Sequence, residues 1–234
     1  MAQGTFTNAW ISATAKILFR GATPPSVDKF YVGLANTSSL SRASTIANFV
    51  SNELTDDAYS RAQLTLSGDG SYNSSANRHE LPIATTIFTA GATSWQFQTA
   101  FLLADAHPIA SNAFTNESVN AATDRITIAN HPWVSGDRLI FTADELATLP
   151  TGINAGTIYQ VLSPATNDFA IATVGSSTPV NFQNTGSGAF HARSANGIVS
   201  IFAIEGSPIT ILPGRSYSYQ IPIALLNTGF VSGN

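Results

Sequence analysis

The chain has 234 residues, of which 44% are apolar and only 10% are charged, and its formal net charge is −4. An average domain has about 25% charged residues, so neutral polar side chains must cover much of this surface. The ten Lys and Arg residues are scattered, which excludes a basic strip for nucleic acid, and we interpret them as solvated or ion-paired. The absence of cysteine excludes disulfides, a thiolate nucleophile and a Cys-based zinc site.

The first predicted element is a helix over residues 8–19, with Thr7 or Asn8 as its N-cap and Gly21 as its left-handed end. Its apolar residues recur at helical spacing and should form one stripe, made of Trp10, Ala13, Ile17 and Leu18. A buried strand is expected over residues 29–35.

Residues 38–54 are ambiguous, and a short helix over Ile46 to Leu54 with Ser41 or Ser44 as its cap is one interpretation. Alternation of apolar and polar residues predicts a strand over residues 59–66. Two further strands are expected over residues 81–88 and 95–103, with a turn at Gly91.

Two strand-like runs belong together although they lie far apart, residues 96–104 (QFQTAFLLA) and 197–204 (GIVSIFAI). Between them, after a polar link over residues 112–120, short alternating runs recur with turns between them, which is typical of a small sandwich or barrel. We expect strands at residues 124–128, 138–142, 156–162, 168–172 and 189–192. The pattern predicts a hairpin whose loop has been replaced by a second β domain.

The predicted fold is therefore mainly β. It consists of a β-sandwich or jelly-roll-like base domain (residues 1–113 plus 196–234) with a short N-terminal helix, and an inserted small β domain (residues 114–195). The run at 198–204 is apolar almost throughout and should be covered on both faces. A separate strand is expected at 207–212, and a last one at 216–226 should lie at a sheet edge because Pro222 lacks an N–H.

The outer parts of the chain carry several short motifs in order. They are 17–21 (ILFRG), 30–34 (FYVGL), 52–54 (NEL) and 59–63 (YSRAQ), followed by the C-terminal strand pair at 101–105, 198–205 and 213–214. This order resembles a family of bacteriophage virion structural proteins. Its members open with a helix ending in Leu-Phe-x-Gly, followed by a Tyr-Tyr-Val-x-Leu-like strand, and then by Glu and a Tyr-x-Arg element.

The middle of the chain resembles a small β module inserted in diverse phage tail and head proteins. The shared residues are 124–127 (DRIT), 130–137 (NHPWVSGD), 149–153 (LPTGI), 156–161 (GTIYQV) and 168–172 (DFAIA). This resemblance implies a virion component, without indicating which part of the virion. The simpler family members lack the insertion, so their role does not carry over whole.

Catalytic chemistry finds little support in the residues. His131, in the run Asn130 to Trp133, could act as a base, but no Gly-x-Ser-x-Gly elbow exists, and we interpret the run as a turn in which Trp133 anchors the inserted core. The isolated residues His79, His107 and His191 have no metal-ligand spacing. We interpret the acids Glu53, Glu80, Asp144, Glu145 and Glu205 as solvated loop residues, not as the pair that glycoside hydrolysis needs.

The expected function is a capsid cement or decoration protein that binds the outer head surface as a homotrimer and stabilises the shell. Its expected partners are the major capsid protein and copies of itself, with no membrane, nucleic acid, metal or cofactor. A tail component, either receptor-binding or adaptor, is the alternative, and an enzyme acting on polysaccharide is disfavoured. The chain should be made in the host cytoplasm and reside in the virion. Candidate subunit or capsid contacts are Tyr217, Tyr219, Arg78, His79 and Glu80.

Overall fold

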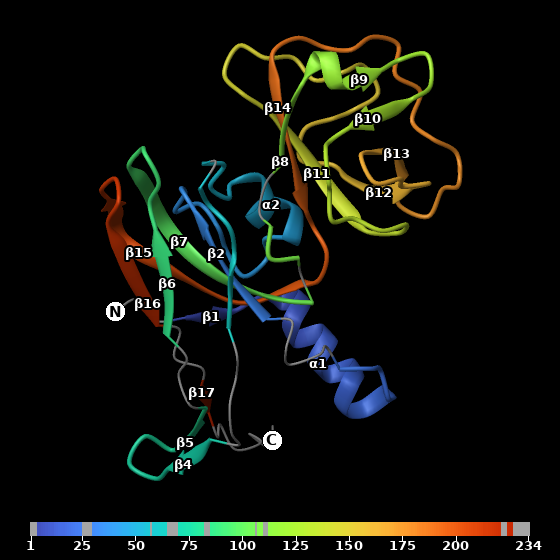
Figure 1. The fold of residues 1–234 in the computed structure, drawn as a ribbon. Helices are drawn as coiled ribbons and strands as arrows, with labels where there is room; N and C mark the ends of the chain where they lie inside the picture. The colour runs from blue at the N-terminus through green and yellow to red at the C-terminus, as the bar shows by residue number, and fades with distance from the viewer. Residues whose placement is uncertain are drawn as a thin grey trace.

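The computed structural model describes residues 4–24, 30–56, 58–64, 70–81, 85–105, 107–109, 112–220 and 224–226 (Figure 1). These residues form a mainly β fold with a short N-terminal helix, as predicted. Their strands belong to four sheets, and every strand pair within them is antiparallel.

The base is built on a five-stranded sheet in the order β1 (Thr5–Phe6), β15 (Ile198–Ile211), β7 (Trp95–Ala104), β2 (Phe30–Ala35) and β3 (Ala62–Gln63). β7 and β15 pair from Ala104 opposite Ile198 to Trp95 opposite Ile211, which confirms the predicted pairing of two distant runs. We expected two strands in place of β15. The structure has one strand whose register shifts between Ile204 and Ile209, where Pro208 has no N–H for a regular ladder.

Both faces of the five-stranded sheet are covered. One face packs against a two-stranded sheet of β6 (Thr85–Thr89) and β16 (Ser216–Gln220), and the other packs against α2 (Ile46–Ser51). The contacts are aromatic, with Phe97, Phe88 and Tyr219 in the first layer and Phe49, Phe101 and Phe202 in the second. The predicted covering of the 198–204 run on both faces is thereby confirmed.

The inserted segment forms a seven-stranded sheet around its own core, at the upper right of Figure 1. Its order is β8 (Asn112–Thr115), β14 (Ala189–Ser194), β11 (Arg138–Ala143), β12 (Ile158–Leu162), β13 (Asp168–Thr173), β10 (Arg125–Thr127) and β9 (Val119–Asn120). The two edge strands, β8 and β9, are joined only by the 3-10 turn η2 (Asn116–Ser118). This short link requires the sheet to curl, and the curled sheet encloses Trp133, Phe141, Phe169 and Phe190.

Residues 112–120 are not the polar link that the sequence analysis predicted. β8 pairs with β14, and Phe114 lies opposite Phe190 with its side chain in the inserted core. The sequence pattern missed this strand because Phe114 is its only buried apolar side chain and the residues around it are mostly Asn and Thr. In so short a strand, one buried aromatic side chain is enough to determine which face points to the core.

Two other local predictions were wrong. Residues 59–61 are not in a strand, because the N–H of Arg61 donates to Pro108 and its side chain points into a buried network. The N-cap of α2 is Thr45, whose N–H donates to Asn48 Oδ1, whereas Ser41 and Ser44 hydrogen-bond to each other. Parts of the predicted strands at 59–66, 81–88 and 216–226, including Pro222, lie outside the described residues.

α1 (Asn8–Arg20) has the predicted caps, since Thr7 accepts from the Trp10 N–H and Gly21 is left-handed. Three residues of its predicted apolar stripe, Trp10, Ala13 and Ile17, line one groove, but Leu18 does not join them. Trp10 packs on the base core, but Leu18 is 69% exposed, and none of the helix residues is buried. In Figure 1 the helix projects at the lower right, away from the sheets.

The remaining strands form a separate arm, β4 (Ser71–Asn73), β5 (Arg78–Glu80) and β17 (Ala224–Leu226). The arm lies below the five-stranded sheet in Figure 1. The predicted strand over 216–226 is thus divided, with β16 in one sheet and β17 in another.

Gly197 marks the point at which the chain re-enters the base, and a side chain is not tolerated there. Its φ is +82°, and a Cβ would lie 1.7 Å from the carbonyl oxygen of Ala104. We expect Gly197→Ala to lower the free energy of unfolding by more than about 2 kcal/mol, since backbone strain and a backbone clash add. Gly175→Ala, at φ +88° in open space, is the matched control and should cost only the strain. Equal losses of stability in urea titrations would contradict this assignment.

Candidate functional site

The base and the inserted sheet meet at a buried ionic network. Arg61 Nε donates to Glu53 Oε1 at 2.8 Å and its Nη2 donates to Oε2 at 2.7 Å, with both side chains 0% exposed. The Tyr59 hydroxyl donates to Glu53 Oε1 at 3.0 Å and accepts from the Leu34 N–H at 2.7 Å. Glu53 is therefore not the solvated loop acid that we expected.

Two arginines carry this network across the junction. Arg61 Nη2 also donates to the carbonyl of Ser194, the last residue of β14, at 2.7 Å. In the other direction, Arg193 of β14 donates to the carbonyls of Val50 and Glu53 at 2.6 and 2.8 Å. Each arginine thus comes from one part of the molecule and binds the backbone of the other.

Burial and the facing charges shift the pKa values of the side chains in this network. Burial raises the pKa of the Tyr59 hydroxyl well above its usual value, and the charge of Glu53 adds to the effect. Burial alone would lower the pKa of Arg61, but the facing Glu53 carboxylate outweighs it and raises that pKa. The pKa of Arg193 is lowered by burial. Arg61 and Arg193 nevertheless stay charged at neutral pH, because a guanidinium does not lose its proton in proteins.

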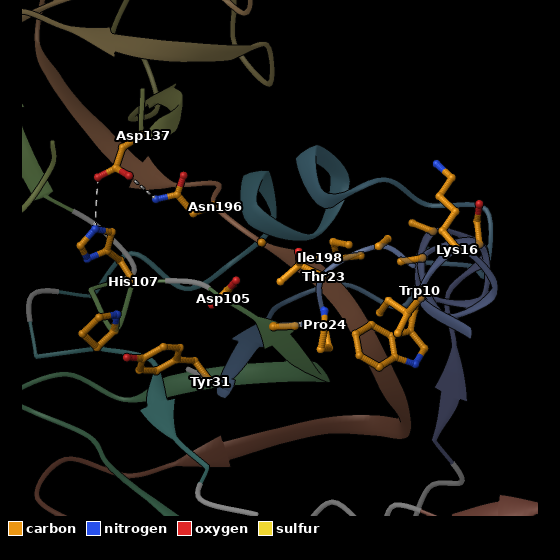
Figure 2. Close-up of a pocket in the computed structure, with 18 of the residues that line it drawn as sticks. Trp10, Lys16, Thr23, Pro24, Tyr31, Asp105, His107, Asp137, Asn196 and Ile198 are labelled. Carbon is orange, nitrogen blue, oxygen red and sulfur yellow. Dashed lines mark hydrogen bonds and ion pairs between the residues drawn. The ribbon is translucent and has the colours of Figure 1, made fainter. Parts of the chain in front are cut away.

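A second cluster joins the two chain crossings between the modules. His107, on the outgoing crossing, lies 3.2 Å from Asp137 Oδ2 through its Nε2. Asn196, on the returning crossing, donates to Asp137 Oδ1 at 3.0 Å and accepts from the Arg138 N–H at 2.8 Å. Figure 2 shows these three side chains together. His107 looks isolated in the sequence, and only the fold brings Asp137 to it.

A groove of about 1050 Å³ runs from this cluster to α1 (Figure 2). Its lining includes Trp10, Lys16, Tyr31, Asp105, Asp137 and Ile198. Aromatic rings beside a few polar groups suit a small ligand. The side chains of Asp137 and Asn196, however, already hydrogen-bond to each other. They therefore join the two modules before they could contact a ligand.

The candidate contact residues of the C-terminal strand are mostly internal. Tyr219 is 6% exposed, and its hydroxyl donates to Glu205 at 3.2 Å, while Tyr217 packs edge-on against Phe97. Burial raises the pKa of both hydroxyls, with the charge of Glu205 as the next cause. Little of the Tyr219 ring is thus left for a contact with a partner, because Tyr217 and Tyr219 project from β16 toward the five-stranded sheet.

The other candidate contacts, Arg78, His79 and Glu80, form β5 in the arm. Arg78 Nε donates to Glu80 Oε1 at 2.6 Å, with side chains 42% and 34% exposed, and Asn73 Nδ2 donates to the same oxygen. The hydrogen bonds of Arg78 and Asn73 hold the pKa of Glu80 below its usual value. Glu80 is therefore a strand residue in an ion pair and not the solvated loop acid that we expected. Contact of Arg78, His79 and Glu80 with a partner stays a prediction.

In the run Asn130 to Trp133, Trp133 anchors the inserted core, as predicted. Trp133 is buried in the inserted core, and the His131 ring stacks on it at 5.6 Å and lies 3.4 Å from the Asp168 carbonyl oxygen through Nε2. In the described part of the chain, no group of three or more His, Asp or Glu residues could hold a metal ion. Within the same residues, no helix is long and apolar enough to cross a membrane.

Comparisons with protein-family models, curated proteins and solved structures found no match to this chain. Its function must therefore be argued from its own surfaces.

Removing the charge of Glu53 should strongly destabilise the fold. Glu53→Gln keeps the shape but leaves the Arg61 guanidinium buried without its carboxylate, and we expect a loss of about 3 kcal/mol in unfolding free energy. The control is Glu80→Gln, which breaks the exposed pair with Arg78 and should leave the denaturation midpoint nearly unchanged. Similar midpoints for both variants would show that the buried pair contributes no more than a surface one.

The Asp137 cluster predicts an acid-dependent contribution to stability. Burial by itself raises the pKa of Asp137, but hydrogen bonds from His107, the Val134 N–H and Asn196 outweigh it and lower the pKa below its usual value. A carboxyl whose folded pKa is depressed stabilises the fold above its unfolded pKa of about 3.9, and this stability is lost as the pH falls through the folded value.

Asp137→Asn should therefore cost about 1 kcal/mol at pH 5 and above, a modest value because solvent screens a partly exposed group. The difference from the wild type should shrink below about pH 4. Urea unfolding of both proteins at pH 5 and pH 3 measures it, and a gap that widens at pH 3 would reverse the sign that we assign.

Proposed function

We propose that this chain is a structural subunit of a bacteriophage virion, a cement or decoration protein that binds the major capsid protein on the outer head surface. It acts without catalysis, in the virion, and as a homotrimer. The phage assignment comes from the resemblance of residues 17–34, 52–63 and 124–172 to virion proteins.

One observation supports the structural role: two elements lie largely outside the cores, and of α1 we find only Trp10 packed on the base core. α1 has no buried residue, and the arm of β4, β5 and β17 lies apart from the larger sheets (Figure 1). An isolated helix of this length and a small sheet are marginal in water. Neighbouring molecules in an assembly would supply the packing that these elements lack.

The chemistry of the arm suits contact with another protein. Tyr72 of β4 is 55% exposed, and a Tyr ring buries a large area with little loss of entropy. Around it stand neutral Ser and Asn residues and the paired charges of Arg78 and Glu80. We assign the capsid contact to this arm, where the sequence placed Arg78, His79 and Glu80.

Stabilisation of the shell then follows from mass action. A protein that binds only the closed shell stabilises it by about 2.7 kcal/mol per site when its free concentration is 100 times the Kd. Many copies act together, and each copy that touches two capsid subunits resists their separation.

The groove beside α1 favours the alternative, a tail component that binds a receptor. Trp10 and Tyr31 with Asp105 would suit a sugar, which presents both apolar faces and hydroxyl groups. Copy number separates the two candidates, because a head cement occurs in hundreds of copies per particle and a tail component in a few.

The test is binding of the purified chain to phage heads that lack it. We expect hundreds of copies to sediment with each head and to raise the temperature at which heads release DNA. Tyr72→Ala in the arm should reduce the bound copies by about tenfold, as expected for an interface aromatic. Leu146→Ala, at a fully exposed residue in the turn that follows β11, is the control and should bind normally. Occupancy of a few copies, or none, would exclude the cement role.

A further inference from the structure

The dipeptide Asn196-Gly197, where the chain returns from the inserted sheet to the base, consists of two residues that the structure requires. Asn196 accepts from the Arg138 N–H at 2.8 Å through its Oδ1 and donates to Asp137 Oδ1 at 3.0 Å through its Nδ2. An amide side chain suits this position because it presents an acceptor and a donor side by side. An ionised Asp or an apolar residue could not make both hydrogen bonds.

The residue that follows must be glycine for a different reason. Gly197 has a φ of +82°, and a Cβ built on it would lie 1.7 Å from the carbonyl oxygen of Ala104. Together the two constraints produce an Asn-Gly sequence, and it is the only one in the chain. An asparagine in this setting is reactive, because glycine has no side chain to hinder attack by its own backbone nitrogen on the amide carbon of Asn196.

The reaction at such a sequence is deamidation, and its only co-reactant is water. The Gly197 nitrogen gives its proton to solvent and forms a bond to Cγ of Asn196, while the Cγ–Nδ2 bond breaks and ammonia leaves with a proton from solvent. Water then opens the resulting succinimide ring at one of its two carbonyl carbons. One product is an ordinary aspartate. In the other, the backbone runs through the former side chain and is one carbon atom longer.

The folded junction opposes this reaction. Nδ2 is the atom that leaves as ammonia, and it is also the atom that donates to Asp137 Oδ1. The other polar atom of the amide is held by the Arg138 N–H, so any reorientation of the amide costs a second hydrogen bond. Asn196 is only half-buried, however, and water can reach it when the contact with Asp137 opens.

We propose that Asn196 is a deamidation site, that opening of its contact with Asp137 sets the rate, and that the product loosens the attachment of the inserted sheet to the base. A carboxylate then stands where Nδ2 faced Asp137 Oδ1 at 3.0 Å. Two carboxylates at this distance disfavour each other's ionised form, so a hydrogen bond is replaced by repulsion. This inference does not depend on the proposed role in a virion.

The longer product should disturb the crossing further. Its extra backbone atom lies immediately before Gly197, which has no spare room beside the Ala104 carbonyl. The chain enters β15 directly after this point, so the change is placed where the base and the inserted sheet are joined.

Peptide mapping by mass spectrometry measures the reaction directly. Trypsin releases residues 194–215 as one peptide in which Asn196 is the only amide side chain, so replacement of NH2 by OH in its mass identifies the site. In mildly alkaline buffer we expect the folded wild-type chain to deamidate more slowly than the same chain in guanidinium chloride, where the hydrogen bonds of Asn196 are lost. No mass change in the unfolded chain would refute the reaction itself.

Asp137→Ala tests the control by the junction. It removes the acceptor of Nδ2 and should accelerate deamidation of the folded chain about threefold to tenfold, the change in an opening equilibrium that loss of one hydrogen bond produces. Asp144→Ala is the matched control. It removes a carboxylate that lies 2.8 Å from His191, just beyond the other end of β11, and should leave the rate unchanged. Equal rates for the two variants would overturn the proposed control.

A double-mutant cycle tests the effect of the product without waiting for the reaction. Asn196→Asp introduces the carboxylate directly and should lower the urea midpoint at neutral pH. Combined with Asp137→Asn, it returns an amide donor and a carboxylate acceptor to the contact with their positions exchanged. The double variant should therefore be more stable than the sum of the two single losses predicts.

Strictly additive losses would show that repulsion between positions 137 and 196 does not loosen the junction. None of these measurements uses phage heads, so failure of the deamidation proposal and failure of head binding are separate outcomes.

Discussion

The bidentate pair of Glu53 and Arg61 is the constraint on which the arrangement of this molecule depends. Two charges without access to water cost several kcal/mol each unless every polar atom finds a partner. Here the carboxylate binds Arg61 and Tyr59, and Arg61 continues to the Ser194 carbonyl. Glu53 and Arg61 have all of these partners only when the base and the inserted strand β14 are in place together, so the pair ties the folding of one to the position of the other.

A junction of this kind has consequences for the rest of the structure. Val50 of α2 packs on Ile140 and Ala195, and the Asp137 cluster joins the two crossings on the other side. The inserted sheet is thereby attached by apolar contact, by buried charge and by hydrogen bonds at once. We infer that these contacts hold the inserted sheet on the base in one orientation, as the proposed virion role would require.

Sequence patterns predicted the strands well where the buried face was long. The pairing of β7 with β15 followed from two apolar runs, and the caps of α1 followed from Thr7 and Gly21. Sequence patterns failed to predict a strand whose buried face consists of a single side chain, as with Phe114 in β8. Glu53 was interpreted as a solvated loop acid because charge alone predicts exposure. Arg61 was expected to be solvated or ion-paired, and the structure shows the ion pair, but buried. Their order, Glu followed by Tyr-x-Arg, was the visible signal, but only the fold shows that the three side chains meet.

The few charged residues of this chain have different roles at the junction and at α1. The charged side chains of Glu53, Arg61 and Arg193 are buried, and they specify how the two modules meet. The exposed face of Ile11, Leu18 and Phe19 has no charged side chain. A neutral outer face relies on shape and apolar area, both of which are insensitive to salt. The buried charges thus determine how the two modules meet, whereas the exposed face of Ile11, Leu18 and Phe19 has no ionic group that would repel a similar surface.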